Sequence, residues 1–217
     1  MQLSLTQPCS WMSLLLLISS LLPWEHVTST PDDQMSNEEL YNKLISISHR
    51  THIVARKMYK NLDVKLSKGR WFKNNGNNTC RTASIPTTKK TEVLLKVVVN
   101  VSNAWKYPLK LMTPAVLTHL GSYDGMLARA IQVKNGCEAI LEGAKVLLSR
   151  VQPGFEENNY PDWPELKQLR SSNEDTHLSA FHTLFYCLYK DIKKINRYLK
   201  ILRGRVIKKQ QMLSIKP

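Results

Sequence analysis

The sequence predicts an all-α fold, a four-helix bundle whose helices run up, up, down and down. Four long runs place apolar residues three or four positions apart, which is the spacing of one face of an α-helix. The connections after the first and third runs are each about twenty residues long, whereas a short turn joins the second run to the third. Because long connections allow consecutive helices to lie parallel, this long–short–long order predicts the up-up-down-down arrangement.

The first helix is predicted to begin near Ser36 and to reach Leu66. Ser36-Asn37-Glu38-Glu39 is a capping box, in which the serine hydroxyl accepts a hydrogen bond from the third helical N–H and Glu39 reaches back. The connection that follows, from Ser67 to Lys90, contains a cysteine.

The second helix is predicted from Thr91 to Leu120. Pro108 and Pro114 lie within it and predict a kink or an early break. The β-branched run Val97-Val98-Val99 would suit a strand, but the apolar residues around it keep helical spacing, so we predict a helix.

The third helix is predicted from Tyr123 to Val151, although Gly136 and Gly143 weaken it. A second long connection, Gln152 to Ser171, precedes the fourth helix, Ser172 to Lys209. The apolar face of this last helix consists of Phe181, Phe185, Leu188, Ile192, Ile195, Leu199, Leu202 and Val206.

A short apolar run, Leu14 to Leu22, lies near the start of the chain. It is too short to span a bilayer, which takes about 20 residues, and it has the character of a signal peptide. No Lys or Arg precedes it, and a buried N-terminal helix is the alternative. We expect cleavage after Ser29 or Thr30, a single domain over residues 30–217, no membrane span and secretion of the mature chain.

Secretion predicts that the cysteines beyond the leader can form a disulfide. Cys80, Cys137 and Cys187 allow one internal bridge and leave one thiol. Asn77 and Asn100 head N-glycosylation triplets, and Asn77 lies in a Gly/Asn-rich stretch that suits an attached glycan.

The chain is strongly basic, with 31 Lys and Arg against 17 Asp and Glu and a net charge of +14. Outside the cell the abundant polyanions are heparan sulfate and anionic membrane surfaces rather than nucleic acid. The bases of the fourth helix therefore predict either a polyanion-binding face or simply a solvated surface. The candidates for polyanion binding are Lys193, Arg197, Lys200, Arg203 and Lys208.

Several short motifs resemble the prolactin/growth hormone family, most closely the rodent placental prolactin-like proteins. The fourth helix contains Cys187-Leu188-Tyr189-Lys190-Asp191-Ile192, followed at the expected spacings by Tyr198 and Ile201. Cys80-Arg81-Thr82-Ala83-Ser84 and Tyr160-Pro161-x-Trp163 are also prolactin-like. The resemblance covers essentially the whole chain, and it implies the fold of the long-chain helical cytokines.

The resemblance also implies a Cys80–Cys187 disulfide, a hormone role and recognition by a single-pass cytokine-type receptor. In prolactins a high-affinity receptor surface is formed by the first helix, the first connection and the fourth helix. Carried over to this sequence, that surface comprises His49, His52, Arg70, Lys190, Lys193, Lys194 and Arg197.

The chain departs from the family pattern at informative positions. Gly204 stands where a cysteine is expected, so the small C-terminal bridge is absent, as is the N-terminal bridge usual in prolactins. Lys193 replaces an expected histidine, which puts binding to the prolactin receptor itself in doubt. Cys137 does not match a family cysteine, and either a buried inert thiol or an intermolecular disulfide in a homodimer would explain it.

Metal binding and catalysis have little support in the sequence. His49 and His52 are three residues apart on one helix and could bind zinc only with a third ligand. The sequence has no Gly-rich phosphate loop, no His-Glu-x-x-His zinc motif and no Gly-x-Ser-x-Gly turn. We therefore expect no metal, no cofactor and no enzymatic activity.

Overall fold

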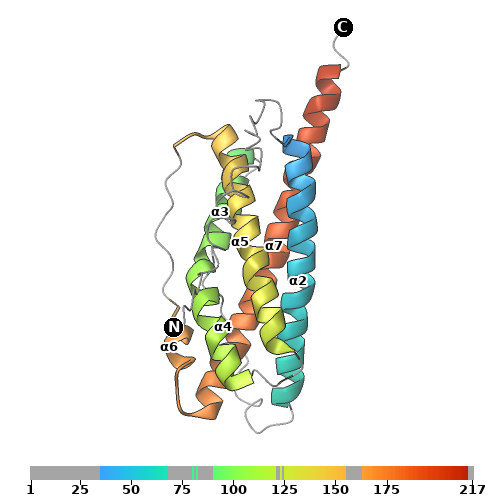
Figure 1. The fold of residues 1–217 in the computed structure, drawn as a ribbon. Coiled ribbons are helices and arrows are strands. Elements are labelled where there is room, and N and C mark those ends of the chain that lie inside the picture. The colour runs from blue at the N-terminus through green and yellow to red at the C-terminus, as the bar shows by residue number, and fades with distance from the viewer. Residues whose placement is uncertain are drawn as a thin grey trace, which may run out of the picture. The chain divides into compact units, whose positions relative to one another are not determined.

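The structure is a computed structural model, and it describes residues 35–67, 80, 82, 90–120, 123, 125–154 and 163–214. These residues belong to one compact unit, Met35–Pro217. The regular secondary structure of the described residues is helical throughout (Figure 1). The predicted leader lies outside the described residues, so the domain boundary at residue 30 stays a prediction. The helices are α2 (Asn37–Ser67), α3 (Thr91–Ala104), α4 (Lys106–Leu120), α5 (Met126–Val151), α6 (Glu165–Gln168) and α7 (Glu174–Ser214).

Side chains cap the first turns of α2 and α7. The Ser36 hydroxyl accepts a hydrogen bond from the Glu39 backbone N–H at 3.2 Å, and the Glu39 carboxylate accepts one from the Ser36 N–H at 2.9 Å. The predicted capping box is therefore present. At α7 the Asn173 side chain accepts a hydrogen bond from the Thr176 N–H at 3.0 Å, so this asparagine is the cap.

The predicted second helix is two helices, α3 and α4, separated at Trp105. The ring of a proline clashes with the carbonyl four residues earlier. For Pro108 that carbonyl belongs to Ala104, which is where α3 ends. Pro114 is accommodated inside α4. Val97–Val99 are helical, as the wider spacing predicted.

Three helix ends differ from the prediction by two residues or more, and one of them is the start of the fourth helix, at Glu174 instead of Ser172. The third helix begins at Met126, three residues later than expected, directly after Gly125 in a left-handed conformation with φ of 64°. The fourth helix continues to Ser214 instead of ending at Lys209. The predicted apolar face ended at Val206, although Leu213 continues the same spacing seven residues later.

Helix α2 lies antiparallel to α7. Glu38 at the start of α2 is 3.5 Å from Arg203 near the end of α7. Asp63 near the end of α2 is 3.0 Å from His182 near the start of α7. The two helices lie side by side in Figure 1.

Helices α3 and α4 also lie antiparallel to α7. Thr91, which begins α3, accepts a hydrogen bond from Arg205 at 3.3 Å. The ring of His119, near the end of α4, stacks on that of His177 in the first turns of α7. Helix α2 and the α3–α4 pair therefore run in the same direction.

Helix α5 lies antiparallel to α2 and so parallel to α7. Arg150 at its end donates a hydrogen bond to Asn37 at the start of α2 at 2.6 Å. Gly136, near its middle, faces Thr51 at close approach. The helices thus run up, up, down and down, which confirms the predicted arrangement. Their apolar faces meet in one core, whose largest fully buried side chains include Trp105, Phe181 and Phe185.

Candidate functional site

A disulfide attaches the first connection to α7. Cys80 and Cys187 are bonded, with their Cα atoms 5.4 Å apart, although 107 positions separate them in the sequence. The structure therefore contains the bridge that the family resemblance implied. It ties the chain ahead of α3 to the helix that contains most of the candidate receptor residues.

A buried carboxylate, Asp191, lies one turn beyond Cys187 and binds three partners. Its oxygens accept hydrogen bonds from the Thr82 hydroxyl at 2.7 Å and the Trp105 indole N–H at 2.9 Å. The Lys194 ammonium lies 3.3 Å away and compensates the charge. Thr82 is thus fixed to α7 two residues after the disulfide, and the Lys194 ammonium is engaged by this carboxylate.

His52 joins α2 to α7 on the candidate receptor face. Its Nδ1 lies 3.1 Å from the Tyr189 carbonyl, and because a carbonyl only accepts, Nδ1 carries the proton of the neutral ring. Burial lowers the pKa of His52, and the nearby charges of Lys193 and Arg56 lower it further. His52 is therefore neutral at physiological pH and connects α2 to α7. His49, one turn earlier on α2, is exposed.

Three half-buried tyrosines, the tyrosine cluster, cover the same α2–α7 seam. Tyr59 of α2 stacks on Tyr189 of α7 with ring centroids 5.2 Å apart, and it meets Tyr186 edge-on at 5.5 Å. The Lys190 ammonium lies 5.3 Å from the Tyr186 ring centroid and 5.9 Å from that of Tyr189, within the range of cation–π attraction. Tyrosine is among the residues enriched at protein-binding surfaces.

A polar contact between α2 and α7 adjoins this cluster. His182 is buried, and its Nε2 is 3.0 Å from a carboxylate oxygen of Asp63. The ring of Tyr59 lies 5.1 Å from that of His182. Burial and the Asp63 carboxylate raise the pKa of Tyr59 to about 12, so its hydroxyl stays protonated. The tyrosine cluster is therefore held by polar contacts between α2 and α7.

The tyrosine cluster is not among the sites predicted from the sequence. Tyr186 and Tyr189 are three residues apart, a spacing that places them on one helix face, and this was the available signal. Their partner Tyr59 belongs to the other end of the chain, so the cluster appears only once α2 and α7 are paired.

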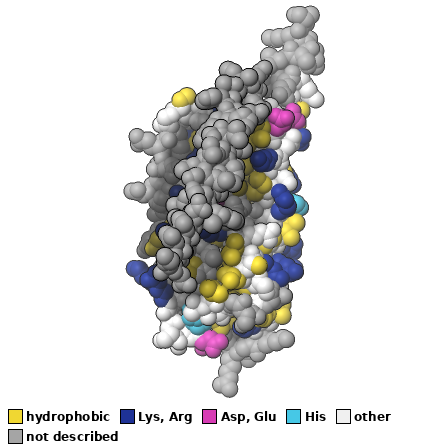
Figure 2. All heavy atoms as spheres, viewed as in Figure 1, with side chains coloured by type: hydrophobic (Ala, Val, Ile, Leu, Met, Phe, Trp, Pro, Cys, Tyr) yellow, Lys and Arg dark blue, Asp and Glu magenta, His cyan; other side chains and the backbone are white. Residues whose placement is uncertain are grey.

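The bases of α7 divide into two groups. Lys193, Arg197, Lys200 and Lys208 are exposed along one side of the helix, and we call them the base stripe. Arg203 is half-buried instead and lies 3.5 Å from Glu38 of α2. On the face that Figure 2 shows, basic and apolar side chains alternate along the edge where Figure 1 places α2. The predicted residue Arg70 lies outside the described residues.

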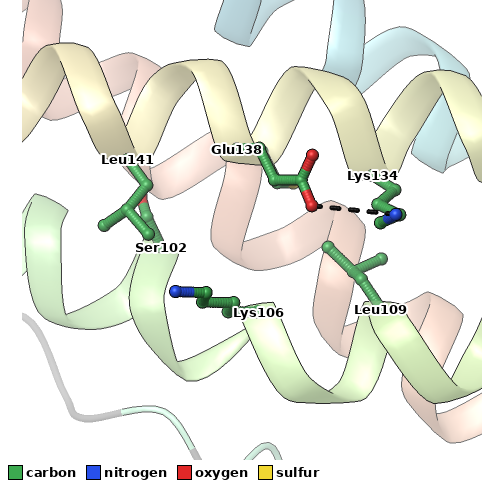
Figure 3. Close-up of a pocket in the computed structure, with 7 residues that line it drawn as sticks. Ser102, Lys106, Leu109, Lys134, Glu138 and Leu141 are labelled. Atoms are coloured by element: carbon green, nitrogen blue, oxygen red, sulfur yellow. Dashed lines mark ion pairs between the residues drawn. The ribbon is translucent and has the colours of Figure 1, made fainter.

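The free cysteine, Cys137, is buried on α5. Burial raises the pKa of its thiol to about 12, so it carries very little of the nucleophilic thiolate. It borders a small cavity between α3–α4 and α5, which the ion pair of Lys134 and Glu138 also lines (Figure 3). This environment favours the inert thiol over the intermolecular disulfide of a homodimer.

The structure describes only one of the two candidate glycosylation sites. Asn77 lies outside the described residues. Asn100 is partly exposed on α3, whereas Ser102 of its triplet is buried. The glycan would be attached to the asparagine, so the partial exposure of Asn100 supports glycosylation at this site. The site stays a prediction.

The described residues contain no group of three or more His, Cys, Asp or Glu side chains arranged to hold a metal ion. None of the described helices is long and apolar enough to cross a membrane.

Known proteins resemble this chain over nearly its whole length. A model of the somatotropin hormone family matches residues 16–211. Prolactin-3C1 of Rattus norvegicus is 64% identical over 208 residues, which cover 96% of this chain and 99% of that protein. Prolactin-3C1 of Mus musculus is 54% identical with the same coverage, and Prolactin-3D4 of Rattus norvegicus is 42% identical over 97% of this chain and 100% of its own length.

These similarities confirm the resemblance on which the hormone prediction depended. They also favour the hormone over a protein whose main role is polyanion binding. The chain belongs to the somatotropin hormone family, whose members are secreted, non-enzymatic hormones that bind cytokine-type receptors.

Proposed function

We propose that this hormone binds the ectodomain of a single-pass cytokine-type receptor through the seam between α2 and α7. The tyrosine cluster is the observation that carries the proposal. Tyr59, Tyr186 and Tyr189 are partly exposed and hold one another in place through ring contacts of 5.2 to 5.6 Å. Tyrosines offer large contact areas with few rotatable bonds, which makes them frequent anchors of protein interfaces.

Basic side chains around the cluster define the chemistry of the partner. Lys190, Lys193 and Arg197 are exposed on α7, and His49 is exposed on α2. A receptor with an apolar centre and an acidic rim would match this surface, because complementary charge steers association and fixes register. Lys194 is half-buried against Asp191, so we expect it to contribute less than Lys193.

We propose further that the hormone does not act on the prolactin receptor. Lys193 stands where the family resemblance predicts a histidine, and it is exposed beside the tyrosine cluster. An added positive charge at an interface built for a neutral side chain disfavours binding by repulsion or desolvation. The resemblance to the rodent placental branch supports a placental source, which in situ detection of the transcript would test.

A direct test measures binding of the glycosylated mature protein to the prolactin receptor ectodomain at physiological salt. We expect no saturable binding by the native protein and a gain of affinity in the Lys193→His variant. Lys110→Glu, a change at an exposed lysine of α4, is the control and should behave as the native protein does. Saturable binding of the native protein would make it a lactogen and would refute the non-lactogenic proposal.

The base stripe supports a second, compatible activity, which is binding to heparan sulfate on cell surfaces. Lys193, Arg197, Lys200 and Lys208 are exposed on one side of α7, where an extended anionic chain could contact them together. Arg203, the fifth predicted contact, already pairs with Glu38, so we expect it to contribute least.

Heparin chromatography separates this activity from receptor binding. Lys200→Glu combined with Lys208→Glu leaves the tyrosine cluster unchanged, and it should lower the salt concentration needed for elution, because the contact is electrostatic. Lys134→Glu together with Lys110→Glu gives the same net charge change on α5 and α4 and serves as the control. Equal elution of the two variants would show that net charge, not the base stripe, governs retention.

A further inference from the structure

Two histidines from different helices stack where α4 ends and α7 begins. The ring centroids of His119 and His177 are 4.1 Å apart, and their planes are inclined by 27°. His177 is buried, with 8% of its surface exposed, and Phe181 one turn later lies against the His119 ring at 6.3 Å. This contact lies outside the surface that we assign to the receptor.

Both rings hold the segment that joins α6 to α7. Nδ1 of His177 lies 3.2 Å from the Ser171 carbonyl, so in the neutral ring Nδ1 carries the proton and donates it. His119 makes a hydrogen bond with the backbone of Leu169. The stacked pair therefore fixes residues 169–171 to the end of α4.

The stacked pair tolerates charge poorly. Burial lowers the pKa of His119 and the neighbouring His177 lowers it further, while the hydrogen bond with the Leu169 backbone opposes both and leaves a net lowering. His177 lies in the first turns of α7, so a charge on either ring would face the other ring across the stack. His119 is therefore neutral at pH 7.4.

The other charged groups of the elements that meet here do not compensate a doubly protonated pair. Glu174 and Asp175 in the first turn of α7 are exposed, as is Arg170 in the segment itself, so water screens them. Glu165 of α6 is half-buried, with one carboxylate oxygen buried and without a hydrogen-bond partner, and it is not among the groups that shift the pKa of His119. Among the described residues, His177 is the titratable group that lowers the pKa of His119.

We propose that His119 and His177 form an acid-sensitive latch that releases the α6–α7 segment from α4 in acidic compartments. A histidine whose pKa is lowered by folding contributes stability that is present above its unfolded value of 6.5 and is lost as the pH falls through the lowered value. Protonation of both rings turns the stack into a repulsive contact. The disulfide and the core contain neither ring, so the opening stays local.

Amide hydrogen exchange of the full disulfide-bonded protein tests the latch. Exchange is measured at pH 7.4 and pH 5.5 and corrected for the intrinsic dependence on pH. We expect exchange of the amides of residues 165–171 to rise at pH 5.5, by up to about tenfold for each ring whose protonation the folded contact suppresses, because this pH lies about one unit below the unfolded histidine pKa of about 6.5. Amides in the middle of α5 and α7 should change little.

Two variants and one titration decide the outcome. His119→Gln retains a side-chain donor but cannot become charged, so its 165–171 amides should lose the pH response, whereas His49→Gln, at an exposed histidine of α2, should keep it. If the 165–171 amides of the His119→Gln variant already exchange fast at pH 7.4, the test is an NMR titration of the imidazoles of the native protein. A lowered pKa for His119 would support the latch. Ordinary, independent titration of both rings, or an unchanged pH response in a protected His119→Gln protein, would overturn it.

Discussion

At the scale of single residues, Asp191 shows how one buried charge joins three parts of the chain. Its carboxylate binds Thr82 from the first connection, Trp105 from the α3–α4 break and Lys194 from its own helix. The family resemblance named Asp191 as part of a motif, but neither spacing nor composition revealed these partners. They are distant in sequence and meet only when the helices pack.

Replacing Asp191 with asparagine should lower the free energy of unfolding by about 1.5–3 kcal/mol, the range for a hydrogen bond to a charged group. Asparagine keeps the shape of the side chain but removes the negative charge that attracts the Lys194 ammonium and strengthens the hydrogen bond from the Trp105 indole N–H. Urea unfolding followed by tryptophan fluorescence measures the change. Glu142→Gln is the control, because Glu142 is exposed and its pairing with Lys145 at 3.6 Å should contribute less than about 1 kcal/mol. Equal effects in both variants would show that the buried network is not stabilising.

At the scale of helices, the sequence predicted the features that depend on contacts within a single helical turn. The capping box at Ser36 and the proline at position 108 each act within one helical turn, so the sequence could reveal the start of α2 and an interruption before α4. Gly136 was interpreted as a weak point of the third helix. The structure shows that it allows α5 to approach α2, because a Cβ atom there would meet the buried side chain of Thr51.

Gly136→Ala should therefore destabilise the protein, although alanine is the better helix former. Thr51 is β-branched, buried and bonded through its hydroxyl to the Ile47 carbonyl at 2.8 Å, so it cannot rotate away freely. We expect a loss of about 1–3 kcal/mol from overpacking. Gly204→Ala on α7 is the matched control: a Cβ atom there meets nothing within 4 Å, so a gain of up to about 1 kcal/mol is expected. A gain in both variants would contradict the close approach of α2 and α5.

At the scale of the whole molecule, the order of connection lengths was enough to predict the up-up-down-down arrangement of the helices. The functional surface was only partly predictable. The resemblance selected the correct pair of helices, α2 and α7, but the tyrosine cluster requires Tyr59 to meet Tyr186 and Tyr189 across that pair. Likewise, Arg203 differs from the base stripe because Glu38 lies beside it, a pairing between opposite ends of the chain.

We propose that the α2–α7 seam binds a receptor and that this binding does not depend on sulfated chains. The most direct measurement is saturation binding of the labelled, glycosylated protein to rodent placental cells treated with heparinase. We predict that saturable binding persists after this treatment. Tyr189→Ala and Lys193→Glu should each weaken the binding at least about tenfold, which is equivalent to about 1.4 kcal/mol. The control variant Lys110→Glu should bind as the native protein does. Loss of all binding after heparinase, or native affinity in both α7 variants, would contradict the claim.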